Sequence, residues 1–167
     1  QAYTFNRFSF EEALDKIKSV GLKYVEAYPG QKLMPGSEAN THYNMPEETR
    51  AQMKQLLDDR GLILLNYGVT GGRDENEWRQ LFEFAKAMGI QTINTEPHPD
   101  QLGYIEEMAN EYGINIALHN HPFPSGYYHP DSVLKYIDGR GSRMGACADI
   151  GHWVRSGLDP VECLKKL

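Results

Sequence analysis

The stretch that decides the fold runs from Leu102 to His121 and reads LGYIEEMANEYGINIALHNH. Its first half places apolar side chains at helical spacing, which predicts a helix with one buried face. These side chains are Leu102, Ile105, Met108, Ala109 and Tyr112. Gly113 then ends the pattern, as a left-handed glycine commonly does. The apolar run from Ile114 to Leu118 that follows predicts a strand buried on both faces, as in the inner layer of a parallel sheet.

The same unit of helix, glycine and strand recurs along the chain. Gly21, Gly61 and Gly89 each follow an amphipathic stretch and precede a short strand-like run. These runs are Leu22 to Val25, Leu62 to Leu65 and Ile90 to Ile93. Counting from a first strand that ends near Thr4 to a last strand that ends at Asp149, we expect six strands, and six helices of which the last begins at Pro160. Such alternation predicts a parallel sheet covered by helices.

Two architectures fit this pattern, an open doubly wound sheet and a (β/α)8 barrel. The open sheet normally has a glycine-rich phosphate loop after its first strand, but residues 6–9 read NRFS and contain no glycine. Polar residues recur at the carboxyl ends of the expected strands, where a barrel builds its site. They are Tyr3, Glu26, Asn66, Glu96, His119 and Asp149. We therefore expect residues 1–167 to form a single incomplete TIM barrel with about six of its eight strand-helix units.

The composition restricts the class of function. The chain has 167 residues, 40% of them hydrophobic, and contains no apolar run long enough to cross a bilayer. A net charge of −6 disfavours nucleic acid as a partner. Cys147 and Cys163 lie in apolar or helical patterns, so buried thiols are expected rather than a disulfide. No leader is visible in residues 1–8, and the compartment and a homo-oligomeric state stay open.

Two constellations carry the chemistry. The segment from Ala117 to Pro122 (ALHNHP) ends a strand with His119 and continues with His121, and the segment from Cys147 to Trp153 (CADIGHW) contains Asp149 and His152. Because one β-α-β repeat separates His119 from Asp149, they should end neighbouring strands about 4.8 Å apart and reach one divalent metal ion. The alternatives are two histidines that are each hydrogen-bonded to neighbouring loops and, for Asp149, a helix cap or a member of an ion pair.

These residues carry a resemblance to a known family. The segments Gly21 to Glu26 (GLKYVE), Gly113 to His121 (GINIALHNH) and Ala148 to His152 (ADIGH) resemble the xylose isomerase-like TIM barrel superfamily of sugar phosphate isomerases and epimerases. The opening Ala2 to Phe5 (AYTF) is similar to the first strand of that group. The resemblance covers essentially the whole chain, and it is more specific for the superfamily than for a reaction.

The resemblance implies a divalent metal (Mn, Zn, Mg or Co) with one ligand from each of strands five to eight. Asp149 matches the ligand of strand six, and His152 matches the histidine that binds a substrate oxygen. The epimerases have a glutamate on strand five that also acts as a base, whereas this chain has His119 there. An imidazole bound to a metal is not free to remove a proton, so this difference puts a two-glutamate epimerisation in doubt.

Other residues are expected at the barrel mouth. Glu96 offers a replacement carboxylate for proton transfer, with a structural glutamate as the alternative. The substrate contacts are assigned to Glu26, His121 and Trp153. A structural ion pair is nearly as good an explanation for Glu26, and packing is the alternative for Trp153. Catalysis is thus assigned to Glu96 and His152, and metal binding to His119 and Asp149.

The sequence as a whole predicts a metal-dependent isomerase or epimerase that acts on a small sugar or keto-sugar through an enediolate. A keto-sugar lyase or hydratase on the same barrel is the nearest alternative, because it shares the enediolate step and suits His119. A non-catalytic sugar-binding barrel is a second alternative. The DNA-repair endonucleases of the superfamily are disfavoured by the acidity of the chain.

Overall fold

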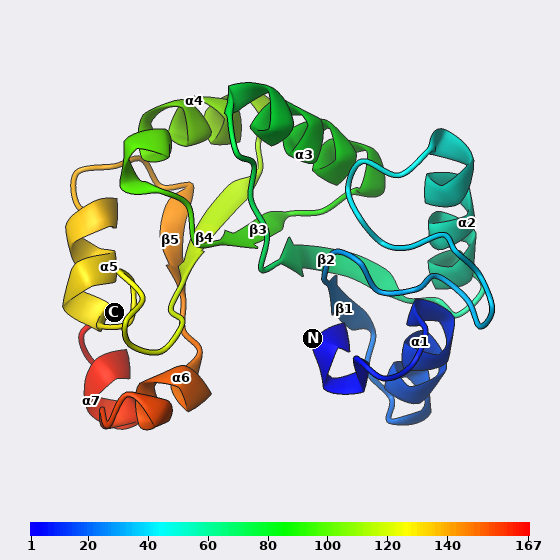
Figure 1. Ribbon diagram of the computed structural model, residues 1–167, viewed down its shortest axis with the longest axis horizontal. Coiled ribbons are helices and arrows are strands. Elements are labelled where there is room, and N and C mark those ends of the chain that lie inside the picture. Colours follow the sequence, from blue (N-terminus) through cyan, green and yellow to red (C-terminus); the bar gives the residue numbers. More distant parts are fainter.

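The computed structural model describes residues 1–167 and contains one parallel sheet of five strands flanked by helices (Figure 1). In chain order the elements are η1 (Ala2–Phe5), α1 (Phe10–Ser19), β1 (Tyr24–Ala27), α2 (Glu47–Asp58), β2 (Ile63–Gly68), α3 (Glu75–Met88), β3 (Thr92–Thr95), η2 (Pro99–Gln101), α4 (Leu102–Tyr112), β4 (Asn115–His119), α5 (Pro130–Ile137), β5 (Met144–Cys147), α6 (Ile150–Arg155) and α7 (Pro160–Leu164).

The strand order identifies the architecture. Each strand pairs in parallel with the next one along the chain, which gives the order β1-β2-β3-β4-β5. A sequential parallel order belongs to a β/α barrel, because a doubly wound sheet reverses its order at a switch point. In Figure 1 the sheet curves, α2, α3, α4 and α5 lie on its outer side, and η1 and α6 lie on opposite sides of the opening. The predicted fold class is therefore confirmed, as a partial barrel.

The predicted strand ending near Thr4 is wrong. This segment forms the 3-10 helix η1, in which the Thr4 amide donates to the Gln1 carbonyl at 3.2 Å and the Asn6 amide to the Tyr3 carbonyl at 3.1 Å. These local hydrogen bonds use backbone groups that pairing with β1 would require. The sheet consequently has five strands instead of six.

A second difference lies after β5. We expected Asp149 to end a strand, but β5 ends at Cys147 and Asp149 is the N-cap of α6. The Asp149 carboxylate accepts a hydrogen bond from the His152 amide at 3.0 Å, as N-cap side chains do. The alternative reading of Asp149 as a helix cap is thus confirmed, and α6 raises the number of α-helices to seven instead of six.

The helix boundaries follow from local chemistry. Helix α1 begins at a capping box, in which Ser9 accepts from the Glu12 amide and the Glu12 carboxylate accepts from the Ser9 amide at 2.8 Å. Helices α3 and α4 end at Gly89 and Gly113, whose φ angles of 73° and 71° lie in the left-handed region. The predicted glycine stops are therefore confirmed at these two positions.

The helices are held on the sheet by apolar stripes. One cluster of 31 buried residues forms the core. It includes Leu102, Ile105, Met108 and Ala109 of α4, all at most 2% exposed, and the fully buried Trp78 of α3. Removing apolar area from water stabilises a fold by about 25 cal/mol per Å². This packing fixes each helix, and with it the loop that follows the neighbouring strand.

Neither cysteine forms a disulfide, as expected. Cys163 is buried and Cys147 is partly buried, and both are free thiols. Burial raises the pKa of the Cys147 thiol to about 11, which keeps it protonated and unreactive near neutral pH. No helix combines the length and the apolar character that crossing a membrane requires.

Gly68 allows β2 and β3 to come close together at their carboxyl ends. It pairs with Asn94 in the sheet, and a Cβ at this position would lie 2.2 Å from the Asn94 carbonyl oxygen. Its φ angle of 153° is also unfavourable for residues with a side chain. A larger residue would therefore push the two strands apart.

We predict that Gly68→Ala lowers the free energy of unfolding by at least about 2 kcal/mol, because the new methyl group overlaps backbone atoms. Urea denaturation followed by circular dichroism measures this change. Gly103→Ala in α4 is the matched control, because no heavy atom lies within 4 Å of its Cβ position. That variant should be stabilised by about 0.5 kcal/mol. Equal effects of the two substitutions would contradict the steric explanation.

Candidate functional site

The candidate site lies at the carboxyl ends of β4 and β5. His119 is the last residue of β4 and pairs in register with Cys147, the last residue of β5. Asp149 follows two residues later, and His152 lies in the first turn of α6. The parallel register therefore brings Asp149 close to His119, although Asp149 lies just after β5 and does not end the strand as the sequence predicted.

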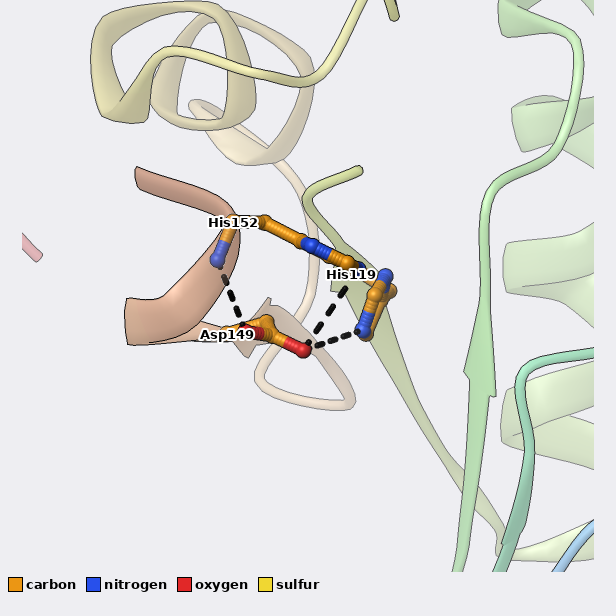
Figure 2. Close-up of side chains that lie close together, drawn as sticks. All are labelled: His119, Asp149 and His152. Atoms are coloured by element: carbon orange, nitrogen blue, oxygen red, sulfur yellow. Dashed lines mark hydrogen bonds and ion pairs between the residues drawn. The ribbon is translucent and has the colours of Figure 1, made fainter. Parts of the chain in front are cut away.

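His119, Asp149 and His152 form a compact cluster. The Nε2 atoms of His119 and His152 each lie 3.6 Å from Oδ2 of Asp149, and one ligand atom from each residue lies within 4.8 Å of the others. Figure 2 shows the two imidazoles on the same side of the carboxylate. The side chains are 8%, 37% and 17% exposed in that order, so Asp149 is the most accessible of the three.

Backbone contacts fix the carboxylate in this position. The buried side chain of Asn120 donates to the Asp149 carbonyl at 2.9 Å and accepts from the Asp149 amide at 2.7 Å. Oδ1 of Asp149 accepts the His152 amide of α6. Because Oδ1 is used in the helix cap, Oδ2 is the oxygen left facing the imidazoles.

Burial keeps the two imidazoles neutral. It lowers the pKa of His119 to about 4, and the nearby His121 acts in the same direction. Burial also lowers the pKa of His152, with Asp149 opposing the shift. Nδ1 of His119 is buried and has no hydrogen-bond partner. A neutral imidazole is the form that binds metals.

The donor set therefore fits a divalent transition metal. Two imidazole nitrogens and a carboxylate oxygen are usual ligands of zinc, manganese and cobalt. One ligand atom from each residue lies within 4.8 Å of the others, and the carboxylate supplies a negative charge that a cation would offset. The three residues thus form a candidate metal site, which includes the predicted ligands His119 and Asp149.

A second polar cluster lies beside the first. The Glu96 carboxylate contacts Nδ1 of His121 with one oxygen and the Ser125 hydroxyl with the other. The His121 ring lies 4.6 Å from the His119 ring and 5.2 Å from the His152 ring, measured between centroids. Glu96 thus orients His121 against the candidate metal ligands.

These histidines open on a cavity of about 700 Å³. Its walls come from η1, the loop after β1, the end of β2, the β4–α5 loop and α6. The lining residues are Gln1, Tyr3, Tyr28, Pro29, Gly68, Val69, His119, His121, Asp149, His152 and Arg155. A cavity of this size suits a small organic ligand.

The remaining predicted residues lie outside the cavity wall. Trp153 is fully buried, which favours the packing alternative. Glu26 does not line the cavity, but it accepts a hydrogen bond at 3.0 Å from Gln1, which does. Glu96 likewise does not line the cavity, but it contacts His121, which does.

Arg155 belongs to the site although the sequence did not predict it there. Arg155 lines the cavity and lies 3.4 Å from Nδ1 of His152, three residues earlier on α6. A spacing of three places two side chains on one helix face. Expecting a helix after Asp149 would therefore have pointed to Arg155.

Fold and site together define a class of protein, a β/α barrel with a candidate metal centre at the carboxyl ends of its strands. Residues 14–166 match the family model described as xylose isomerase-like TIM barrel, so the chain belongs to that family. The resemblance seen in the sequence is therefore confirmed. No curated protein matches the chain significantly.

Solved structures show the same fold. An uncharacterised protein from Parabacteroides distasonis has 36% identity and a TM-score of 0.84, and the match covers 99% of this chain and 68% of that protein. A D-tagatose 3-epimerase-like protein has 19% identity and a TM-score of 0.71, covering 95% of this chain and 67% of that one. The 3-keto-D-glucoside 4-epimerase YcjR from E. coli has 14% identity and a TM-score of 0.67, covering 95% and 70%.

The low pKa of His119 predicts how stability depends on pH. The folded protein keeps His119 neutral down to about pH 4, whereas the unfolded chain binds this proton near its ordinary value of 6.5. The unfolded state therefore binds more protons between these values, and stability falls as pH falls. With chelator present, we expect His119 alone to lower the free energy of unfolding by about 2 to 3 kcal/mol between about pH 7 and pH 4.5.

Urea denaturation at each pH measures this effect, with His119→Gln as the comparison. The variant has no titrating group at this position and should show a correspondingly smaller dependence on pH. The same dependence in both proteins would mean that His119 is not the group responsible.

Proposed function

We propose that the protein is a metal-dependent sugar isomerase or epimerase that acts on a small sugar or keto-sugar. The observation that carries this proposal is the convergence of His119, Asp149 and His152 at one cavity. The family membership and the fold shared with sugar epimerases support it. Many polar groups line the cavity, which suits a ligand rich in hydroxyl groups.

His119 and Asp149 would hold the metal ion, with His152 beside it. A divalent cation at this position would polarise neighbouring substrate oxygens and so increase the acidity of the adjacent carbon–hydrogen bond. His152 is assigned to a substrate oxygen, because it is more exposed than His119 and lies on the cavity wall. Arg155 is next to His152 and adds a positive charge to that wall.

His121 and Glu96 are assigned to moving the substrate proton. Glu96 fixes Nδ1 of His121, so the rest of this ring faces the cavity. The imidazole can hold a proton near the substrate carbon, and the carboxylate stabilises the charged ring, as in other carboxylate-histidine pairs. Glu96 therefore acts as a positioning residue for His121.

A keto-sugar lyase or hydratase is the second candidate. It is favoured by one observation, namely that His119 stands where the resemblance places a glutamate ligand that also serves as a base. Proton transfer would then rely on one carboxylate-histidine pair, and a reaction that needs a second base on the opposite face of the substrate would lack it.

Metal binding is tested with single substitutions. We predict that His119→Ala and Asp149→Ala each weaken Mn²⁺ or Co²⁺ binding at least about 100-fold, and that His152→Ala weakens it less than about tenfold. Isothermal titration calorimetry gives these affinities. The control is His98→Ala, which alters an exposed histidine outside the cavity. Unchanged binding in both the His119 and Asp149 variants would refute this metal site.

The reaction is tested by exchange of substrate hydrogen with solvent. D-fructose, D-tagatose and D-psicose are incubated in D₂O with the Mn²⁺-loaded protein, and loss of the proton next to the carbonyl group is followed by NMR. We predict exchange with at least one ketose, and a rate at least about 100-fold lower for Glu96→Gln, because His121 loses its charged partner. Glu107→Gln, an exposed glutamate of α4, is the control.

Three outcomes separate the candidates. Exchange with formation of an epimer or isomer supports the proposed function. Exchange with elimination or loss of water identifies the lyase or hydratase instead. No exchange with any ketose, despite metal binding, would contradict the enzyme proposal and favour a sugar-binding barrel.

A further inference from the structure

A second cavity lies next to the first at the barrel mouth. It has a volume of about 510 Å³ and is formed by the segment between η1 and α1 and by the loop after β1. Arg7, Gln31, Lys32 and Met34 are among its lining residues. None of these four residues lines the larger cavity, so the second cavity has its own set of contacts.

Two tyrosines form the boundary between the cavities. Tyr3 and Tyr28 line both of them. Their rings pack edge to face, with centroids 5.0 Å apart and an interplanar angle of 75°. Tyr3 is 55% exposed, so one of its faces is accessible. A ligand longer than a single sugar could therefore pass over this aromatic pair and occupy both cavities.

Gln31 supplies an unused hydrogen-bond acceptor. The residue is only 3% exposed, and its Nε2 donates to the Phe8 carbonyl at 3.1 Å. Its backbone amide donates to Thr41, which anchors the residue. The Oε1 atom is buried without any partner. A buried carbonyl oxygen without a donor is costly, and a ligand hydroxyl in this cavity could provide one after a small adjustment of the side chain.

The charged side chains around the second cavity differ in whether they already form hydrogen bonds or ion pairs. Glu12 is held by Ser9 in the capping box, and the exposed Lys32 lies 3.6 Å from Glu38. Arg7 is exposed and forms no ion pair with any carboxylate. Its guanidinium can therefore donate to ligand oxygens without breaking an existing contact.

We propose that the second cavity binds the second sugar unit of a glycosidic substrate, while the first unit occupies the cavity of His119 and Asp149. This inference rests on the proposed function, since the reacting unit must lie at the candidate metal centre. The glycosidic bond stays intact and spans the Tyr3–Tyr28 pair. Arg7 and Gln31 bind hydroxyl groups of the distant unit, and a monosaccharide leaves them without a partner.

The test uses protein with ¹³C-labelled methionine methyl groups. Met34 lines only the second cavity, and Met53 is fully buried and lines neither cavity. Met34→Leu assigns the Met34 signal. Cellobiose, maltose, lactose and sucrose are titrated, with D-glucose, D-galactose and D-fructose as their component monosaccharides. We expect at least one disaccharide to shift the Met34 signal, and the monosaccharides and the Met53 signal to show no change.

Arg7→Ala should weaken the binding of that disaccharide about tenfold, because a charged donor is lost. Arg50→Ala, which changes an arginine outside both cavities, is the control and should leave binding unchanged. The inference is overturned if no disaccharide shifts Met34, or if the monosaccharides shift it equally. This measurement needs neither metal nor turnover, so its failure is distinguishable from failure of the proposed function.

Discussion

The candidate site depends on the pair of hydrogen bonds between the Asn120 side chain and the backbone of Asp149. Asn120 directly follows β4, so this buried amide joins the end of one strand to the loop after the next. The link holds the backbone of Asp149 at the start of α6, where Oδ1 accepts the His152 amide and Oδ2 lies 3.6 Å from Nε2 of His119. Without these two hydrogen bonds, the pairing of β4 with β5 would still bring the strand ends together, but the Asp149 carboxylate could rotate away from His119.

The same arrangement explains why the site suits a cation. Two imidazoles that burial keeps neutral lie at equal distances from one carboxylate oxygen, and no strong donor satisfies that oxygen. A carboxylate that is partly buried beside neutral groups loses part of its hydration, and a bound cation would compensate for this loss. The features that would favour a bound cation are therefore costly in the protein without one, as stability is often lowered at a site suited to a ligand.

The sequence predicted the repeating parts of the molecule better than the unique ones. Helix stripes and glycine stops such as Gly113 depend on neighbours in the chain, and the parallel sheet follows from their repetition. The wrong predictions concern segments whose structure depends on tertiary contacts or that are too short to show a periodic pattern. The segment from Ala2 to Phe5 looks like a strand but closes its hydrogen bonds locally, and the short helix α6 has too few residues to show a helical period. The proximity of His119 to Asp149 was predictable because adjacent parallel strands bring their carboxyl ends together, but the Asn120 hydrogen bonds and the helix cap that orient Asp149 were not.

The positions of Glu96 and Gln31 show a further limit of sequence analysis. The Glu96 carboxylate contacts His121, and the buried Gln31 side chain donates to the Phe8 carbonyl in the segment before α1. The role of each side chain depends on which partner the fold brings to it, and residue type alone does not specify that partner. Both residues follow the carboxyl ends of strands, where loops vary most among barrels. The barrel therefore fixes the position of the candidate site, and the loops after β1 and β4 contribute walls to the cavities beside it.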